Sequence, residues 1–131
     1  MNSFLLISNN ADHQKQIQEI CVKMSFDLTT KQTITDYILE LEDKVYQSVI
    51  IDYNLEDDFI KIVQITKKIR PRLPIIFISE SDDKKYLQKI YNEGVFYIYV
   101  SPLNEDILSE VLKSSIVYKM KEDNLTNKFT N

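Results

Sequence analysis

The sequence predicts a single α/β domain in which a parallel β-sheet carries helices on both faces. Two observations lead to this fold class. Short apolar runs alternate with amphipathic helical patterns five times along the 131 residues. Several of these runs, such as Val49–Ile51, are apolar at every position, as in strands that are buried on both sides. Strands that alternate with helices pair in parallel, because each helix returns the chain across the sheet.

The expected elements can be placed in chain order. Apolar runs at 4–7, 49–51, 75–78 and 95–100 predict strands, and 26–30 is a weaker candidate. Apolar residues at helical spacing predict helices within 11–24, 33–41, 59–69, 86–94 and 107–121. Asn10 and either Thr33 or Thr35 are the expected helix starts, and Gly94 is an expected helix end. We therefore expect a domain over residues 1–121, followed at 122–131 by a polar tail or the start of a linker.

Composition limits the classes of partner and compartment. A formal net charge of −4 gives no general attraction to nucleic acid. The basic cluster at 67–72 is either a basic patch or the solvated end of a helix, and we favour the helix end. The sequence has no apolar run that could span a membrane and no signal peptide. Its single cysteine, Cys21, lies in an apolar helical pattern, so we expect a buried thiol and a cytoplasmic protein.

Polar residues follow the predicted strands at one edge of the sheet. These residues are Ser8, Asn9, Asp52, Ser79 and Ser101, and only Asp52 is charged. The carboxyl ends of parallel strands are where open α/β sheets bind ligands, so a site is expected there. The alternative is that Asp52 only caps the next segment, because Asp is a common turn residue.

The order and spacing of these features resemble those of response-regulator receiver domains, over about residues 1–121. The resemblance rests on the first strand and its polar end, the strand Val49–Asp52, the segment Pro74–Ser79, the pair Glu93–Gly94, and Pro102 after the fifth strand. It implies a five-stranded parallel sheet of the flavodoxin-like type with strand order 2-1-3-4-5. It also implies a role in bacterial two-component signal transduction or a phosphorelay.

In that family the aspartate ending the third strand accepts a phosphoryl group from a histidine kinase, and the resemblance places Asp52 at this position. Ser79 matches the hydroxyl residue that contacts the phosphoryl group. Ser8 and Asn9 occupy the positions of the acidic pair that holds Mg²⁺, and Ser101 occupies the position of the phosphoryl-binding lysine. The resemblance therefore implies a degenerate site, because Mg²⁺ requires oxygen ligands that usually include carboxylates.

Three further expectations come from the same comparison. The acids Glu56, Asp57, Asp58 and Glu80 are candidates to compensate for the lost charge. Ile98 occupies the position of the aromatic residue that moves in the receiver switch, so this switch has lost its ring. The Ser101–Pro102 peptide bond is expected to be cis, as the corresponding bond is in the family.

We interpret the chain as a pseudo-receiver, a non-enzymatic domain that signals by protein–protein interaction without Mg²⁺-dependent phosphorylation and without a cofactor. One alternative is a functional receiver that is phosphorylated on Asp52 with weakly bound Mg²⁺. A second alternative is a small-ligand-binding flavodoxin-like domain. The single histidine, His13, is expected to be a solvated surface residue.

The expected partners are proteins, such as a histidine kinase or an output domain, and neither nucleic acid nor a membrane. A homodimer through the face made by the fourth helix, fifth strand and fifth helix is a further expectation. The aromatic residues to inspect on that face are Tyr86, Tyr91, Tyr97 and Tyr99.

Overall fold

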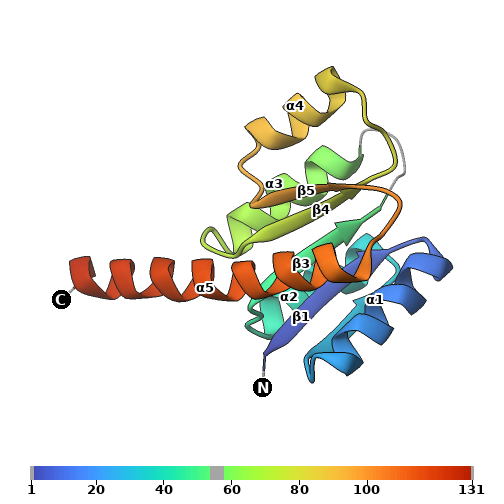
Figure 1. The fold of residues 1–131 in the computed structure, drawn as a ribbon. Helices are drawn as coiled ribbons and strands as arrows, with labels where there is room; N and C mark the ends of the chain where they lie inside the picture. The colour runs from blue at the N-terminus through green and yellow to red at the C-terminus, as the bar shows by residue number, and fades with distance from the viewer. Residues whose placement is uncertain (1, 54–57, 131) are drawn as a thin grey trace.

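The computed structural model describes residues 2–53 and 58–130, and its strands and helices alternate along the chain (Figure 1). The elements are β1 (Ser3–Ser8), α1 (Ala11–Lys23), β2 (Asp27–Lys31), α2 (Ile34–Asp43), β3 (Ser48–Asp52), α3 (Asp58–Ile69), β4 (Ile75–Ser79), α4 (Lys84–Asn92), β5 (Tyr97–Val100) and α5 (Glu105–Thr130).

The strands form one parallel sheet in the order β2-β1-β3-β4-β5. This order confirms the predicted 2-1-3-4-5 topology. In the register of β1 and β3, Ser8 is the direct partner of Asp52. The ends of these two neighbouring strands are therefore fixed beside each other by the backbone pairing of the sheet.

Two apolar clusters cover the sheet, one on each face. Helices α2, α3 and α4 pack on one face, where Tyr37, Phe59 and Ile90 meet alternate residues of β1, β3 and β4. Helices α1 and α5 pack on the other face, where Ile17 and Leu108 belong to the second cluster. Figure 1 shows the same layers, with α1 and α5 in front of the sheet and α2 and α3 behind it. The sheet strands are apolar on both sides because both faces are covered.

Side chains cap the helices close to the predicted starts. The carboxamide oxygen of Asn10 accepts a hydrogen bond from the backbone N–H of His13, and the hydroxyl of Thr33 accepts one from Asp36. Thr33, not Thr35, therefore begins α2. Gly94 follows α4 with a φ of +84°, a left-handed conformation that suits glycine at a helix end.

The structure differs from the predicted boundaries at β2, β5 and α5. Strand β2 is shifted by one residue, and β5 begins two residues later than expected. Helix α5 does not end near residue 121 but continues as helix to Thr130, and its C-terminal part projects beyond the sheet (Figure 1). The assignment of 122–131 as a tail or linker stays a prediction. Of the described helices, none combines the length and the apolar character needed to cross a bilayer.

Candidate functional site

The candidate site lies at the carboxyl ends of β1, β3 and β4, where the sequence predicted it. Asp52 ends β3, Ser8 ends β1 and Ser79 ends β4, and all three residues are fully buried. Asn9 follows β1 directly and is exposed, while its backbone N–H donates to the carbonyl oxygen of Asp52 over 3.4 Å. The sheet therefore brings together the residues expected from the strand ends.

The buried carboxylate of Asp52 is held by two side chains. The Ser8 hydroxyl donates to Oδ2 of Asp52 over 2.8 Å. Nδ1 of His13 lies 3.0 Å from the same oxygen and 3.1 Å from Oδ1. A buried carboxylate needs such partners, because removing it from water without them costs several kcal/mol. Both oxygens of Asp52 thus have hydrogen-bond partners within the chain.

The position of His13 corrects a prediction. We expected a solvated surface histidine, but the residue is only 8% exposed and bridges α1 to β3. Its place in the first turn of α1 is fixed by the Asn10 cap, which binds its backbone N–H. The sequence did contain a signal, because His13 precedes the core residue Ile17 by four positions and so shares its helix face.

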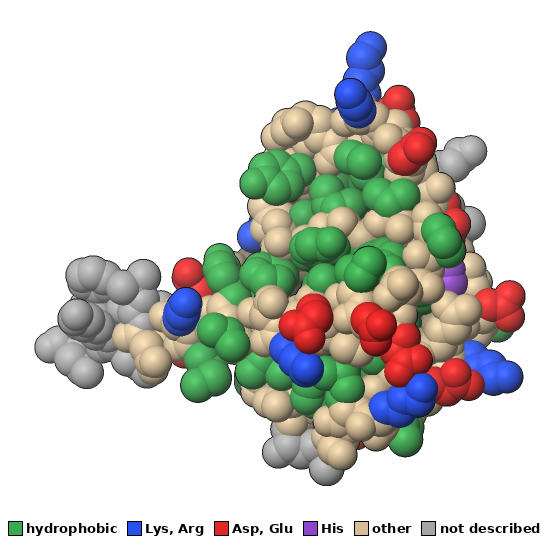
Figure 2. Space-filling view, in the orientation of Figure 1, with side chains coloured by type: hydrophobic (Ala, Val, Ile, Leu, Met, Phe, Trp, Pro, Cys, Tyr) green, Lys and Arg blue, Asp and Glu red, His purple; other side chains and the backbone are tan. Residues whose placement is uncertain are grey.

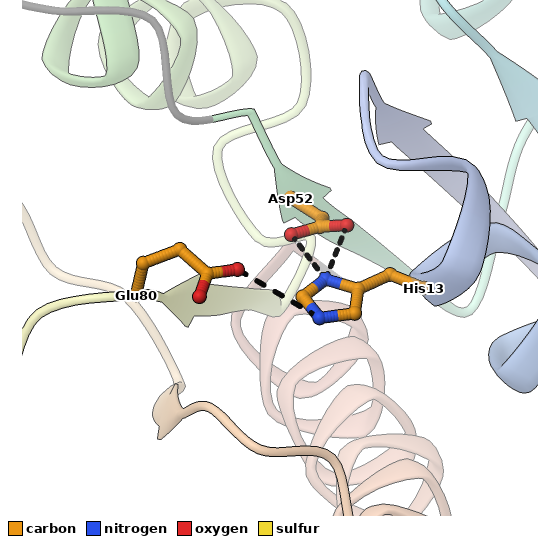
Figure 3. A group of neighbouring side chains, drawn as sticks. All are labelled: His13, Asp52 and Glu80. Atoms are coloured by element: carbon orange, nitrogen blue, oxygen red, sulfur yellow. Dashed lines mark hydrogen bonds and ion pairs between the residues drawn. The ribbon is translucent and has the colours of Figure 1, made fainter.

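Among the candidate compensating acids, Glu80 is the one whose side chain the structure describes, and it lies at this site. Its Oε1 lies 3.7 Å from Nε2 of His13, so His13 stands between the carboxylates of Asp52 and Glu80 (Figure 3). Among the other candidates, Glu56 and Asp57 lie outside the described residues. Asp58 begins α3, and its side chain is likewise outside the described part.

The remaining predicted site residues are near the edge but do not bind Asp52. The Ser79 hydroxyl donates to the carbonyl oxygen of Ser81 over 2.7 Å and accepts from its N–H over 3.1 Å. The backbone N–H of Ser101 donates to the carbonyl oxygen of Ser79 over 2.8 Å. The Ser101–Pro102 peptide bond is cis, which confirms the prediction for Pro102.

The aromatic residues of the fourth-helix, fifth-strand and fifth-helix face divide into two groups. Tyr91 is 65% exposed and Tyr97 is 40% exposed, whereas Tyr99 is only 5% exposed and packs beneath α5. Tyr86 is partly buried against Phe59. Tyr99 is therefore a core residue, whereas Tyr86 packs at the margin of the core. At the switch position, Ile98 is partly buried on the opposite side of the sheet, against the cluster under α2, α3 and α4.

Comparisons of the whole fold identify similar solved structures. A CheY-like response regulator receiver domain protein from Methanospirillum hungatei JF-1 superposes with a TM-score of 0.84 at 16% identity, covering 93% of this chain and 98% of that chain. A receiver domain protein from Clostridium thermocellum gives 0.83 at 19% identity, covering 92% and 98%.

A third similar structure is the receiver domain of the sensor histidine kinase PA1611 from Pseudomonas aeruginosa PAO1, which was solved with a magnesium ion coordinated in its active site cleft. It gives a TM-score of 0.78 at 17% identity and covers 88% of this chain and 97% of that chain. No family model and no curated protein matches the sequence. This chain thus has the fold of the CheY-like response-regulator receiver domains.

Proposed function

We propose that this protein is a two-component-type signalling domain that acts by binding protein partners, without conventional Mg²⁺-dependent phosphorylation of Asp52. One observation carries the proposal. The oxygens of Asp52, which occupy the phosphoryl-acceptor position, are already engaged by Nδ1 of His13 at 3.0 and 3.1 Å and by the Ser8 hydroxyl at 2.8 Å. An acceptor carboxylate has to be free to attack the phosphorus atom, and here it is shielded.

The donor set around Asp52 fits Mg²⁺ poorly. Mg²⁺ requires near-octahedral oxygen ligands and gives up its water reluctantly, so a site usually needs one or two free carboxylates. Ser8 and Asn9 supply none, and an imidazole nitrogen lies against the carboxylate of Asp52. Ser101 supplies no positive charge for a transferred phosphoryl group. His13 and Ser8 instead satisfy the buried carboxylate without a metal ion.

The surface proposed for protein binding is the face formed by α4, β5 and α5, which we call the output face. Exposed apolar side chains gather on it, including Tyr91, Tyr97 and Ile107. Figure 2 shows apolar side chains over much of this side of the molecule. A groove of about 400 Å³ is lined by residues of β5 and α5, among them Tyr97, Ile107 and Val111. Exposed apolar area of this kind is typical of protein interfaces.

We propose a second copy of this chain as an occupant of the output face. Exposed lysines lie on α4, at Lys85 and Lys89, and exposed acids lie on α5, at Asp106 and Glu110. A two-fold axis through the face would place α4 of one copy near α5 of the other, so that unlike charges meet around the apolar centre. The face therefore has the apolar and charged components that a symmetric contact uses.

Phosphorylation is the direct test. The chain is incubated with acetyl phosphate and millimolar Mg²⁺, and the intact mass is followed beside a receiver domain that has the acidic pair and the lysine. We expect the phosphoryl adduct on the control protein only. An adduct on this chain that is absent from the Asp52→Asn variant would overturn the proposal and support a conventional phosphoacceptor.

A further inference from the structure

The second ring nitrogen of His13 has no role in the proposed function. Nδ1 is bound to Asp52, while Nε2 is directed toward Glu80, with 3.7 Å between Nε2 and Oε1 (Figure 3). This distance is too long for a hydrogen bond. The His13 side chain is nine-tenths buried, whereas the side chain of Glu80 is 48% exposed at the rim. An imidazole nitrogen and a carboxylate thus face each other at the rim of the site, at ion-pair distance and without a hydrogen bond.

Asp52 determines how Nε2 is presented. When the imidazole is neutral, a hydrogen bond from Nδ1–H to the carboxylate leaves the lone pair on Nε2. Asp52 is fully buried and is also held by Ser8, so the carboxylate that orients the ring is itself fixed. A histidine that binds a metal almost always donates its other N–H to a carboxylate, a backbone carbonyl or water. The pair of Asp52 and His13 has this arrangement.

The distance between Nε2 of His13 and Oε1 of Glu80 suits a bound metal ion. Zn²⁺ binds histidine nitrogen at about 2.0–2.1 Å and carboxylate oxygen at about 2.0–2.2 Å, so two such ligands in a tetrahedral site stand about 3.3 Å apart. The observed 3.7 Å needs only a small movement of the exposed Glu80 side chain. Ligand atoms of His13, Asp52 and Glu80 all lie within 4.8 Å of one another.

We propose that His13 Nε2 and the Glu80 carboxylate bind a borderline divalent cation of the Zn²⁺ class, with Asp52 orienting the imidazole and water completing the coordination. The mixed nitrogen and oxygen set favours such an ion over Mg²⁺, which prefers oxygen alone. The proposed ligands differ from the acidic pair that the family uses for Mg²⁺. The inference does not depend on the signalling role, because it concerns only ion binding at the edge of the sheet.

Calorimetric titration of the full chain with ZnCl₂, in buffer free of chelators, tests the site. We expect one Zn²⁺ per chain with micromolar affinity and no heat of binding from Mg²⁺ at the same concentrations. Glu80→Gln should weaken Zn²⁺ binding at least 10-fold, and His13→Gln should do the same. Asp52→Asn should weaken it about 10- to 100-fold, the range seen when an orienting partner is lost. Glu42→Gln, at an exposed acid of α2 away from the output face, is the matched control and should leave the affinity unchanged.

Nitrogen-15 NMR gives a second readout at a single histidine. Addition of Zn²⁺ should shift the Nε2 resonance more than the Nδ1 resonance, because Nε2 is the proposed ligand. Glu80 is at the rim, so Glu80→Gln should fold even if a His13 variant does not. Binding that is retained in Glu80→Gln, or no Zn²⁺ binding at up to 1 mM, would overturn the proposal. If Zn²⁺ failed to bind, the proposed function would still stand or fall by the acetyl phosphate experiment.

Discussion

Nδ1 of His13 lies 3.0 Å from Oδ2 and 3.1 Å from Oδ1 of Asp52, and this contact joins the first turn of α1 to the end of β3. The two residues are 39 positions apart in sequence, and both are buried. The contact has two consequences. It stabilises the buried carboxylate, and under the proposed function it also keeps the oxygens of Asp52 from accepting a phosphoryl group.

Removal of His13 should therefore destabilise the fold. His13→Leu keeps much of the side-chain volume but deletes the donor to Asp52. We expect the free energy of unfolding to fall by about 3 kcal/mol, because a buried carboxylate loses one of its partners. Chemical denaturation at neutral pH measures the loss.

A double-mutant cycle separates this effect from lost packing. If the unpaired charge causes the loss, adding Asp52→Asn to His13→Leu should recover part of the stability. Lys23→Ala is a control, since it breaks the exposed ion pair with Glu105, and ion pairs in water contribute little to stability. A cost for His13→Leu as small as that of Lys23→Ala would contradict the role assigned to the buried contact.

A conventional metal site should return only when His13 is also replaced. Ser8→Asp, Asn9→Asp and Ser101→Lys restore the acidic pair and the lysine of the receiver pattern. With His13 still on Asp52, we expect this triple variant to gain little Mg²⁺ affinity. Adding His13→Ala should give a melting temperature that rises with millimolar Mg²⁺.

The same redesign should lower stability when no metal is present. Aspartates at positions 8 and 9 would crowd Asp52 with like charge, which the existing site avoids. The melting temperature of the fourfold variant in chelator should fall below that of the parent. If Mg²⁺ raised the melting temperatures of the triple variant and the fourfold variant equally, His13 would not be what keeps Mg²⁺ from binding.

Much of the fold could be predicted because its strands are distinctive in sequence. Ile75–Ile78 is apolar at every position, and both sides of this interior strand are covered by helices. Strand β2 was harder to place, since it is an edge strand whose residues are only half-buried or exposed. The end of α5 could not be found from amphipathic periodicity, because the helix continues beyond the sheet on which its first turns pack.

The candidate site was predicted only in part. Strand ends meet at one edge of a parallel sheet, so Ser8 and Asp52 could be paired before their distance was known. His13 was misjudged because its role depends on how α1 is oriented over the sheet. Glu80 was named for its charge alone, and its partner could not be foreseen without the position of His13.

Cys21 should react slowly with alkylating agents in the folded protein. Burial raises the pKa of its thiol to about 11, so little thiolate is present at neutral pH. Relative to a thiol of pKa 9.0, the thiolate population falls about 100-fold. Labelling with iodoacetamide at pH 7.5, followed by intact mass, should be at least this much slower in buffer than in denaturant. Rapid labelling of the folded chain would show that the thiol is accessible.

Tyr46 should stabilise the fold through Glu40 in a pH-dependent manner. The Tyr46 hydroxyl donates to the Glu40 carboxylate, and this bond, helped by Lys44, holds the pKa of Glu40 below its ordinary value of 4.5. A lowered carboxyl pKa stabilises the fold fully above the unfolded value, and this stabilisation is lost as the pH falls through the folded value.

Tyr46→Phe should therefore cost about 1 kcal/mol at pH 7. Below about pH 4 the difference between the variant and the parent should narrow, because protonated Glu40 no longer provides a charged acceptor. Denaturation curves at pH 7, 5 and 3 measure the difference. A difference that stays constant with pH would mean that Tyr46 acts through packing alone.

The last prediction concerns self-association through the output face. Tyr97→Ala and Ile107→Asp remove exposed apolar contacts beside the groove between β5 and α5. We expect the parent to sediment as a concentration-dependent dimer and both variants as monomers, with little change in unfolding free energy.

Val22→Ala is the matched control, because Val22 is an exposed apolar residue of α1 on a different surface. Tyr99→Ala should behave differently and cost about 3 kcal/mol, since Tyr99 is buried under α5. A parent that remains monomeric at several hundred micromolar would exclude a second copy as the occupant. Dimers that persist in Tyr97→Ala and Ile107→Asp, or that are weakened equally by Val22→Ala, would place the interface elsewhere.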